Sequence, residues 1–360
     1  MTRAWVEVDL GALCRNGAAI AARSGVPLLP MVKADGYGVG AVRAALALDD
    51  LQPYGFGVAE VREGEELRRA GITRPIFVFT PILRDEIDGL RRADLTPALG
   101  DPAVIESWGR TGRAWHLQVD TGMSRAGMPW NEVGQHHDLL SRTPPAGVFT
   151  HFHSAELENE SRATQEQRLA AALAALPARP AQVHAENSAA VEAQAPSPFT
   201  VCRPGIFLYG VQGITGGALV PEPVASIRAR IVELRTVRDG ESVSYDATWR
   251  AKGDRRIATV PVGYADGYRR SLSNVGFGLL HGQRVPVAGR VTMDMTMLDV
   301  TETTAALGDI VTLLGRDGGD VLTVGEVSGL ADVSPYELLT GLRLRLPRLY
   351  VGEDVGEAAA

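Results

Sequence analysis

The chain has 360 residues, a length that predicts two domains rather than one. Hydrophobic residues make up 45% of it and charged residues 22%, as in ordinary globular proteins, and a net charge of −7 argues against a nucleic-acid partner. No run reaches the roughly 18 apolar residues of a membrane span, the start lacks a signal-peptide pattern, and the two cysteines have neither disulfide nor metal spacing. We therefore expect a cytoplasmic protein with no metal site and no membrane partner.

Residues 26–212 alternate short apolar runs with longer amphipathic segments, a pattern that predicts repeated β/α units. Such repeats favour a parallel sheet, and about eight of them favour a (β/α)8 barrel of the TIM type. The predicted strands are residues 28–33, 54–59, 76–80, 95–99, 115–119, 147–152, 182–185 and 206–210. Helices are predicted between them, for example over residues 60–70 and 162–176.

The pattern changes at the Pro-Glu-Pro sequence of residues 221–223, beyond which short apolar runs are separated by turn signals. This predicts a second, mainly antiparallel β domain. Its predicted strands are residues 226–234, 257–262, 284–288, 297–300 and 309–314. We place the α/β barrel in residues 1–222, with roughly the first ten residues able to pair with the β domain, and the β domain in residues 223–360. A short helix is predicted over residues 334–340, capped by Ser334 and with Pro335 in its first position.

Lys33 lies where the first predicted strand ends and a glycine-rich turn begins. The chain contains only one other lysine, Lys252, and every other basic residue is arginine. A buried lysine can lose its proton and react with a carbonyl group, which arginine cannot do. Lys33 is therefore a candidate nucleophile, and the alternative is a strand-end lysine that simply reaches solvent.

Polar clusters also occur near other predicted strand ends, the side on which (β/α)8 barrels carry their active sites. The clusters are residues 120–125, 150–153, 184–189 and 202–206. Each has an ordinary alternative, such as a helix cap at Asn187 and Ser188 or a hydrogen-bonded core histidine at His151 and His184. Because five such clusters recur, counting that of Lys33, we expect them to converge on one site.

Eight short motifs recur in the order known from one family. They are residues 32–38 (VKADGYG), 119–125 (VDTGMSR), 150–152 (THF), 184–188 (HAENS), 203–206 (RPGI), 242–245 (SVSY), 262–267 (VGYADG) and 289–294 (GRVTMD). With them the sequence resembles the alanine racemases over nearly the whole chain. The resemblance implies an α/β barrel with a C-terminal β domain, pyridoxal 5'-phosphate as cofactor, and interconversion of L-alanine and D-alanine to supply D-alanine for peptidoglycan.

The resemblance also implies roles for particular residues. Lys33 would bind the coenzyme and act as a base on one face of the substrate, and Tyr245 of the partner subunit would act on the other face, which implies a homodimer with shared active sites. Cofactor binding is implied for Lys33, Tyr37, Arg125, His151, His184, Asn187, Ser188, Arg203, Gly205 and Ile206. Substrate binding is implied for Arg125, Tyr264, Arg290 and Met293.

Three positions depart from the family's pattern. Gln118 stands where many relatives have a lysine that becomes carbamylated and orients Arg125, so we expect no carbamate here but a bound chloride or a hydrogen bond from Gln118. Leu344 stands where some relatives have a tyrosine near the phosphate and the entrance, so we expect one hydroxyl to be lost there. Glu156 replaces the usual aspartate of the entrance corridor and keeps its charge.

Three other functions stay open at this stage. A broad-specificity, serine or lysine racemase would differ in pocket shape and keep the catalytic residues. A non-catalytic pyridoxal-phosphate-binding protein would need neither a second domain nor Tyr245. A decarboxylase would release carbon dioxide without interconverting enantiomers.

Overall fold

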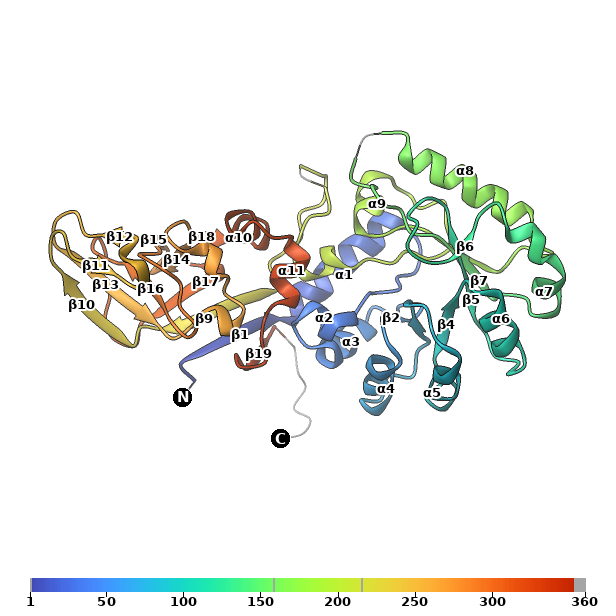
Figure 1. Cartoon of the computed structure of the whole chain (residues 1–360), viewed down its shortest axis with the longest axis horizontal. Helices are drawn as coiled ribbons and strands as arrows, with labels where there is room; N and C mark the ends of the chain where they lie inside the picture. The colour runs from blue at the N-terminus through green and yellow to red at the C-terminus, as the bar shows by residue number, and fades with distance from the viewer. Residues whose placement is uncertain (1, 158, 215, 353–360) are drawn as a thin grey trace.

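The computed structural model describes residues 2–157, 159–214 and 216–352. Figure 1 shows a barrel of strands and helices at one end of the molecule and a mainly β domain at the other, with α1, α2 and α11 between them. Among the described residues, no helix combines the length and the apolar composition needed to cross a membrane.

The barrel is built on a sheet whose neighbouring strands are all parallel and whose residues are nearly all buried. Parallel strands covered on both faces are expected to be mainly apolar. The buried polar residues His116, Gln118 and His184 are exceptions here. In order across the sheet they are β2 (Phe56–Val58), β3 (Ile76–Val78), β4 (Thr96–Leu99), β5 (His116–Asp120), β7 (Gly147–Phe149) and β8 (Gln182–His184), with β6 (Met128–Pro129) paired to β5 outside this path.

Two extended segments, residues 28–31 and 200–204, close the barrel. They form a parallel bridge at Leu28 and Cys202, and a second parallel bridge joins Met31 to Gly57 of β2. On the other side, the amide of Arg203 donates to the carbonyl of Glu186, just beyond β8, at 2.8 Å. Eight parallel segments therefore surround the axis, and the predicted (β/α)8 barrel is confirmed.

One predicted barrel strand is wrong. Residues 206–210 do not form the eighth strand, which lies at residues 200–204; they form the 3-10 helix η3 (Ile206–Tyr209), all of it buried. A short apolar run fits a buried strand and a buried helical turn equally well, so the pattern alone could not distinguish them.

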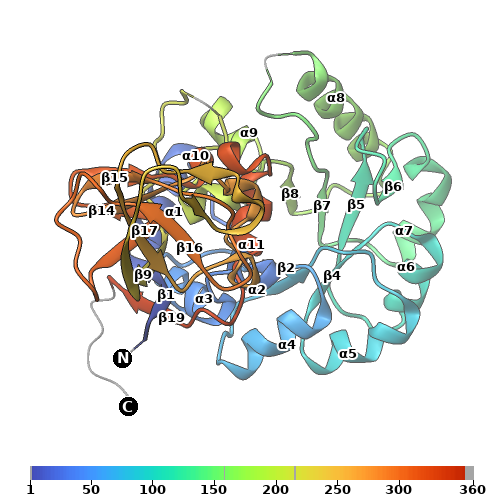
Figure 2. The same ribbon diagram turned by 60° about the vertical axis from the view of Figure 1, so that its left-hand side comes forward.

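Helices cover the outside of the barrel, as the view of Figure 2 shows for α4 to α8. The helices α4 and α8 correspond to the predicted residues 60–70 and 162–176. The helical elements are α1 (Leu10–Ser24), α2 (Lys33–Tyr37), α3 (Ala41–Asp49), α4 (Val61–Arg69), η1 (Arg84–Glu86), α5 (Ile87–Arg92), α6 (Pro102–Gly109), η2 (Val133–His136), α7 (His137–Arg142), α8 (Ser161–Ala174) and α9 (Ser188–Ala193).

The β domain is mainly antiparallel, as predicted. One sheet contains β15 (Gln283–Pro286), β14 (Phe277–Leu280), β17 (Ile310–Asp317), β9 (Ala225–Arg230), β1 (Ala4–Asp9) and β19 (Arg348–Val351), with β18 (Asp320–Leu322) paired to β17. The others contain β10 (Glu233–Val237), β13 (Arg255–Val260) and β16 (Thr296–Asp299), and the pair β11 (Ser242–Val243) and β12 (Trp249–Arg250). Its helical elements are η4 (Tyr245–Ala247), η5 (Tyr264–Asp266), η6 (Arg270–Leu272), α10 (Val324–Ala331) and α11 (Pro335–Thr340).

The predicted helix at residues 334–340 is confirmed as α11, since the Ser334 side chain accepts a hydrogen bond from the amide of Glu337 and Pro335 is its first residue. The predicted strand 226–234 is divided between β9 and β10, which belong to different sheets.

The chain connects the two parts at β1 and again near its end. β1 lies between β9 and β19 in the β domain, and Asp9 then caps α1 of the barrel by accepting from the amide of Ala12 at 2.8 Å. In the opposite direction, Arg348 at the start of β19 donates to the carbonyl of Gly38 at 2.8 Å, and the Tyr350 hydroxyl donates to the carbonyl of Val39 at 3.1 Å. The turn that follows Lys33 is thus held directly by the β domain.

Candidate active site

A cavity of about 320 Å³ opens at the carboxyl ends of the barrel strands. It brings together most of the residues that the sequence singled out in the barrel, from five separate strand ends. Its lining consists of Met31, Lys33, Tyr37, Phe79, Gln118, Arg125, Phe149, His151, Asn187, Ser188, Arg203, Gly205, Ile206 and Tyr336. Three of these side chains are Lys or Arg and none is Asp or Glu, so the described lining suits an anionic ligand.

Lys33 enters the cavity at the start of an unusual turn. The four residues that follow it, Ala34 to Tyr37, all have positive φ angles, between 53° and 59°. Left-handed backbone costs free energy for residues other than glycine, so surrounding contacts must hold this turn in place. The Asp35 carboxylate accepts from the amide of Ala41 at 2.9 Å and stabilises the exit of the turn.

Glu63, on α4, holds the entrance of the same turn. One of its carboxylate oxygens accepts from the amide of Ala34 and the other from the amide of Ala59, both at 2.7 Å. The carboxylate thus ties the residue after Lys33 to the end of β2. Sequence reasoning missed Glu63, because a glutamate in the first turn of a helix is an ordinary helix signal.

The electrostatic surroundings of Lys33 act against its charged form. Burial lowers the pKa of the Lys33 amine, and the positive charge of Arg125 lowers it further, while the carboxylate of Glu63 opposes both effects. A lowered amine pKa increases the fraction of neutral, nucleophilic lysine at physiological pH.

Arg203 and two histidines form a buried chain of hydrogen bonds behind the cavity. One guanidinium nitrogen of Arg203 lies 2.6 Å from Nδ1 of His184, and Nε2 of His184 lies 2.8 Å from Nδ1 of His116. Since arginine can only donate, His184 Nδ1 accepts, and neutral His184 must donate from Nε2 to His116. The other Arg203 nitrogen donates to the carbonyls of Thr150 and Ala185. His184 therefore supports Arg203 from behind and does not line the cavity.

The histidines around Arg203 are neutral near neutral pH. Burial and the charge of Arg203 lower the pKa of His116 to about 4, and burial, Arg203, Arg125 and Lys33 lower that of His151 to about 3. Burial also holds the pKa of His184 well below its usual value. Burial lowers the pKa of Arg203 to about 10, so this residue still carries its charge at pH 7.

The far end of the cavity combines hydroxyl groups with backbone amides. The Ser188 hydroxyl accepts from the amides of Gly205 and Phe207 at 3.0 and 3.3 Å. A Cβ atom at position 205 would collide with the Tyr37 hydroxyl, so glycine allows that hydroxyl and the backbone to lie in contact. The Tyr37 ring stacks on Tyr209 with centroids 4.5 Å apart, which fixes its direction.

Asn187 has a structural role that the sequence left open. Its side chain caps α9 by accepting from the amide of Ala190 at 3.0 Å, and it also borders the cavity. The cap interpretation therefore holds for Asn187, whereas the neighbouring Ser188 hydroxyl is directed at the amides of residues 205 and 207.

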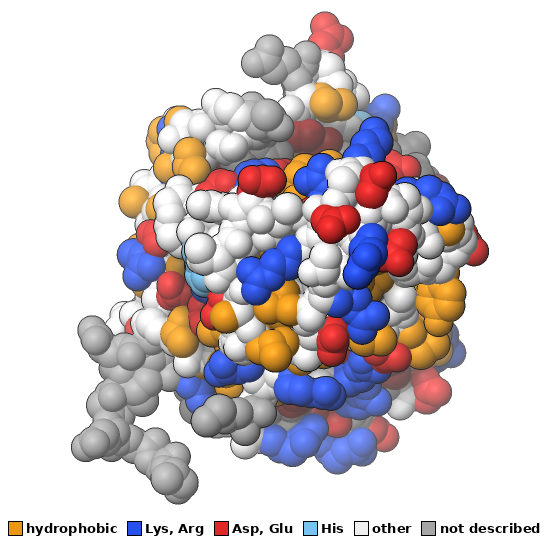
Figure 3. Space-filling view, turned by 90° about the vertical axis from the view of Figure 1, so that its left-hand side faces the viewer, with side chains coloured by type: hydrophobic (Ala, Val, Ile, Leu, Met, Phe, Trp, Pro, Cys, Tyr) orange, Lys and Arg blue, Asp and Glu red, His pale blue; other side chains and the backbone are white. Residues whose placement is uncertain are grey.

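The remaining predicted site residues belong to the β domain and do not line the cavity. Tyr245 is 69% exposed, Met293 52% and Tyr264 42%, and Nε of Arg290 lies 3.3 Å from the Asp246 carboxylate. Tyr245 begins η4, which follows β11 and precedes β12 in the chain. Figure 1 shows these two strands at the end of the β domain away from the barrel. Figure 3 looks onto this end, where hydrophobic side chains are exposed among charged ones. One chain alone therefore does not unite the two predicted catalytic residues.

Leu344 and Tyr336 differ in how they lie relative to the cavity. Leu344 is 82% exposed and is not part of the cavity lining, whereas Tyr336 of α11 lines the cavity, with its ring centroid 6.1 Å from that of Tyr37. Tyr336 therefore brings a second tyrosine to the cavity beside Tyr37. Burial raises the pKa of Tyr336, and the exposed carboxylate of Glu156 lies close enough to contribute. The predicted helix at residues 334–340 was the only signal for Tyr336.

Gln118 lines the cavity beside Arg125, and its amide donates to the carbonyl of Ala126 at 3.2 Å. Other residues of the site carried no recognisable signal. Phe149 stacks on His184 at 5.0 Å and also lies against Arg203, and Phe79 and Met31 add apolar lining.

Two family models match the chain. "Alanine racemase, N-terminal domain" covers residues 8–213 and "Alanine racemase, C-terminal domain" covers residues 224–350. The chain belongs to the alanine racemase family. Alanine racemases from Symbiobacterium thermophilum and Geobacter sp. are each 40% identical to it, covering 98% and 96% of this chain and 98% of each relative. The chain is therefore an amino-acid racemase, an isomerase.

Similar solved structures agree with the assignment to the alanine racemase family. Alanine racemase from E. faecalis superposes with a TM-score of 0.91 at 30% identity, over 97% of this chain and 98% of that one. An alanine racemase from Bartonella henselae, described with covalently bound pyridoxal phosphate, has a TM-score of 0.89 at 26% identity, over 98% of this chain and all of that one. A histidine racemase from Leuconostoc mesenteroides has a TM-score of 0.88 at 25% identity, over 97% and 98% of the two chains.

Replacing Glu63 by glutamine should destabilise the protein by about 1–3 kcal/mol, because hydrogen bonds from amides to a carboxylate are stronger than those to a neutral amide. At least one of the two 2.7 Å bonds would also lose its acceptor. The measurement is the urea dependence of unfolding. The matched control is Glu66→Gln on the same helix, whose side chain is exposed. Equal stability of the two variants would contradict a role for Glu63 in holding the turn.

Stability should fall as the pH is lowered from 6.5 to 5. His116, His151 and His184 stay neutral in the folded protein, since their pKa values are lowered, whereas the unfolded chain takes up protons below its ordinary histidine pKa of 6.5. Each histidine should contribute a loss of up to about 1.4 kcal/mol per pH unit. Urea denaturation at a series of pH values measures the slope. His137→Gln, at an exposed histidine, should keep the full slope, and a flat profile would contradict the assignment.

Proposed function

We propose that the protein interconverts L-alanine and D-alanine with pyridoxal 5'-phosphate held in the barrel cavity. The observation that carries the proposal is one cavity that unites a lysine with lowered pKa, a set of hydroxyl and amide groups, and a buried arginine whose hydrogen bonds go to a histidine and two backbone carbonyls. We place the boundary between the barrel and the β domain after residue 222, and we assign β1 to the β domain, where it pairs with β9 and β19.

The cavity fits the coenzyme in charge and in hydrogen-bonding groups. Tyr37, Ser188 and the amides of Gly205 and Ile206 would hold the phosphate, since hydroxyls and turn amides suit an anion. Lys33 would bind the coenzyme covalently at the other end. Once bound, the coenzyme supplies an electron sink for the negative charge that develops at the α-carbon of the substrate.

Arg203 would face the nitrogen of the coenzyme ring. Its charge is held by His184 and by two backbone carbonyls, not by a carboxylate, and it remains protonated at pH 7. Arginine does not give up a proton, so the ring nitrogen would stay largely unprotonated. A less electron-poor ring delocalises charge less completely, and we infer that this limits side reactions such as transamination.

Racemisation requires a base on each face of the α-carbon. Lys33 would move the proton on one face, and the phenol of Tyr245 on the other. Tyr245 is 69% exposed and lies outside the cavity of its own chain, so the proposal requires a homodimer in which each barrel receives Tyr245 from its partner. Tyr264, Arg290 and Met293 would enter with it, and Arg125 would meet both coenzyme and substrate.

A racemase with a broader or different substrate is the second candidate. The similarity to a histidine racemase favours it, because that enzyme shares the fold at 25% identity. Steady-state rates on a panel of L- and D-amino acids, including serine, lysine and histidine, discriminate between the candidates. In either case we place the enzyme in the cytoplasm, and in the first case its product would serve peptidoglycan synthesis.

Incubation with L-alanine in deuterated water should produce D-alanine and place deuterium on the α-carbon of the product, because one base removes the α-proton and the other delivers a deuteron that it has exchanged with the solvent. Lys33→Ala should abolish both signals, measured by chiral chromatography and mass spectrometry. Lys252→Ala is the matched control, since Lys252 is the other lysine of the chain and is exposed. Full racemase activity in Lys33→Ala would contradict the proposal.

Mixing Lys33→Ala subunits with Tyr245→Phe subunits should restore activity that neither variant has alone. Hybrid dimers carry one intact site, with Lys33 from one chain and Tyr245 from the other, so random exchange should give about a quarter of the wild-type activity. A chain carrying both substitutions, mixed with Lys33→Ala, should give none. Recovery of no activity in the first mixture would show that the site is not shared.

A further inference from the structure

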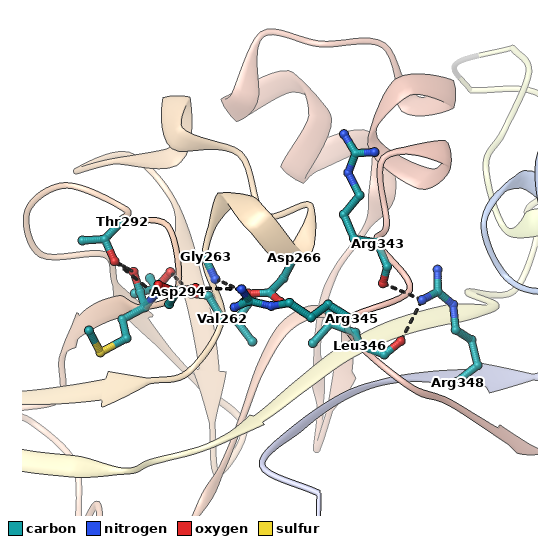
Figure 4. Close-up of polar contacts among 11 residues, drawn as sticks. Val262, Gly263, Asp266, Thr292, Asp294, Arg343, Arg345, Leu346 and Arg348 are labelled. Atoms are coloured by element: carbon teal, nitrogen blue, oxygen red, sulfur yellow. Dashed lines mark hydrogen bonds and ion pairs between the residues drawn. The ribbon is translucent and has the colours of Figure 1, made fainter.

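Arg345 joins two aspartates from different loops of the β domain (Figure 4). Its guanidinium lies 2.7 and 3.2 Å from the two oxygens of Asp266, and a further nitrogen lies 2.7 Å from Asp294. The carboxylate of Asp266 is 2% exposed and also accepts from the amide of Gly263 at 2.9 Å. Since a buried carboxylate is costly without a partner, Arg345 is its necessary counter-charge.

These two aspartates stand on the loops that carry Tyr264 and Met293. The loops are paired by their backbones: the amide of Tyr264 donates to the carbonyl of Thr292, and that of Ala265 to the carbonyl of Met293, both at 3.0 Å. A Cβ atom at Gly263 would collide with those same two carbonyls. The paired loops therefore move as one unit, and Arg345 is the side chain that ties this unit to residues 343–348.

Residues 343–348 are themselves anchored at both ends. The amide of Arg343 donates to the carbonyl of Asp266 at 3.1 Å. At the other end, Arg348 donates to the carbonyls of Leu346 and Arg343 within the segment, and to Gly38 of the turn after Lys33. Arg345 thus connects the paired loops to a segment that is already rigid.

We propose that Arg345 is a positioning residue, which fixes Tyr264 and Met293 in its own subunit in the arrangement that the partner's active site receives. The inference rests on the proposed function, in which both residues are donated across the dimer. Arg345 acts on the site built around Lys33 of the other subunit and leaves its own Lys33 site unaffected. Arginine is required because its planar fork reaches two carboxylates at once, which a single ammonium group cannot do.

The first experiment compares Arg345→Met, Arg345→Lys and Arg343→Met in the holoenzyme. Arg343 is exposed, and Figure 4 shows its side chain directed away from both aspartates, so Arg343→Met removes the same charge nearby and should change little. Arg345→Met should lower kcat/KM for alanine by about 10- to 100-fold, as expected when substrate contacts are misplaced by about 1 Å. The loss should appear mainly as a higher KM. Arg345→Lys should show a loss intermediate between those of the wild type and Arg345→Met.

The second experiment uses hybrid dimers with one intact site. Lys33→Ala chains donate the loops and Tyr245→Phe chains donate Lys33. Placing Arg345→Met on the Lys33→Ala chain should cause the full loss, because that chain supplies the loops to the working site. Placing it on the Tyr245→Phe chain should leave kcat and KM of the hybrid unchanged.

Arg345 acts in the proposed way only if the loss follows the chain that donates the loops. An equal loss in both arrangements, or a loss only on the chain that supplies Lys33, overturns the proposal. A reference hybrid without activity overturns the shared site and the role of Arg345 together. Melting temperatures of all variants are compared, and if Arg345→Met does not fold, Arg345→Lys replaces it in both arrangements with the same directional expectation.

Discussion

The left-handed turn that follows Lys33 is the constraint on which most of the site depends. Four consecutive residues in this conformation are held by Glu63 at the entrance and by Asp35 at the exit. The last of them, Tyr37, stacks on Tyr209, whose hydroxyl donates to the carbonyl of Met31 on the strand before the turn. These contacts connect the end of the turn back to the strand that precedes Lys33. They therefore fix the orientations of the Lys33 and Tyr37 side chains relative to each other.

The positive charge of the cavity depends on Arg203 and on the groups that accept its hydrogen bonds. Burial of Arg203 without a carboxylate is tolerated because a histidine nitrogen and two carbonyls accept its hydrogen bonds, and aromatic faces of Phe149 and Phe79 lie beside it. A carboxylate at this place would have neutralised the guanidinium. Because the groups that accept its hydrogen bonds are neutral, Arg203 keeps its positive field in the cavity. Burial is the main cause that lowers the pKa values of His151 and His184, and this field lowers them further. Burial and this buried cation thus act together to keep the surrounding histidines neutral.

The sequence predicted the cavity residues that stand in contiguous motifs, because in a barrel every strand end leads to the same face. Lys33, Arg125, His151 and Ser188 needed no more than that rule. That rule does not identify a site residue whose local sequence already has an ordinary structural explanation. Glu63 lies in the first turn of a helix, His116 begins a strand, and their partners lie 29 and 68 residues away. The apolar run 206–210 predicts a strand, but a buried segment is apolar whether its backbone is extended or helical, and here it is helical.

Tyr245, Tyr264 and Met293 present the opposite case, because their motifs are recognisable while none of the three lines the barrel cavity of its own chain. A residue donated to another subunit gains nothing from its own barrel, so its position must be fixed before the subunits meet, or the entropy of ordering it weakens association and catalysis alike. The backbone pairing of the two loops and the bridge from Arg345 provide that order within one chain. The same segment reaches the turn of Lys33 through Arg348 and Gly38. In the proposed homodimer, each subunit would therefore prepare the two halves of two different active sites on one continuous framework.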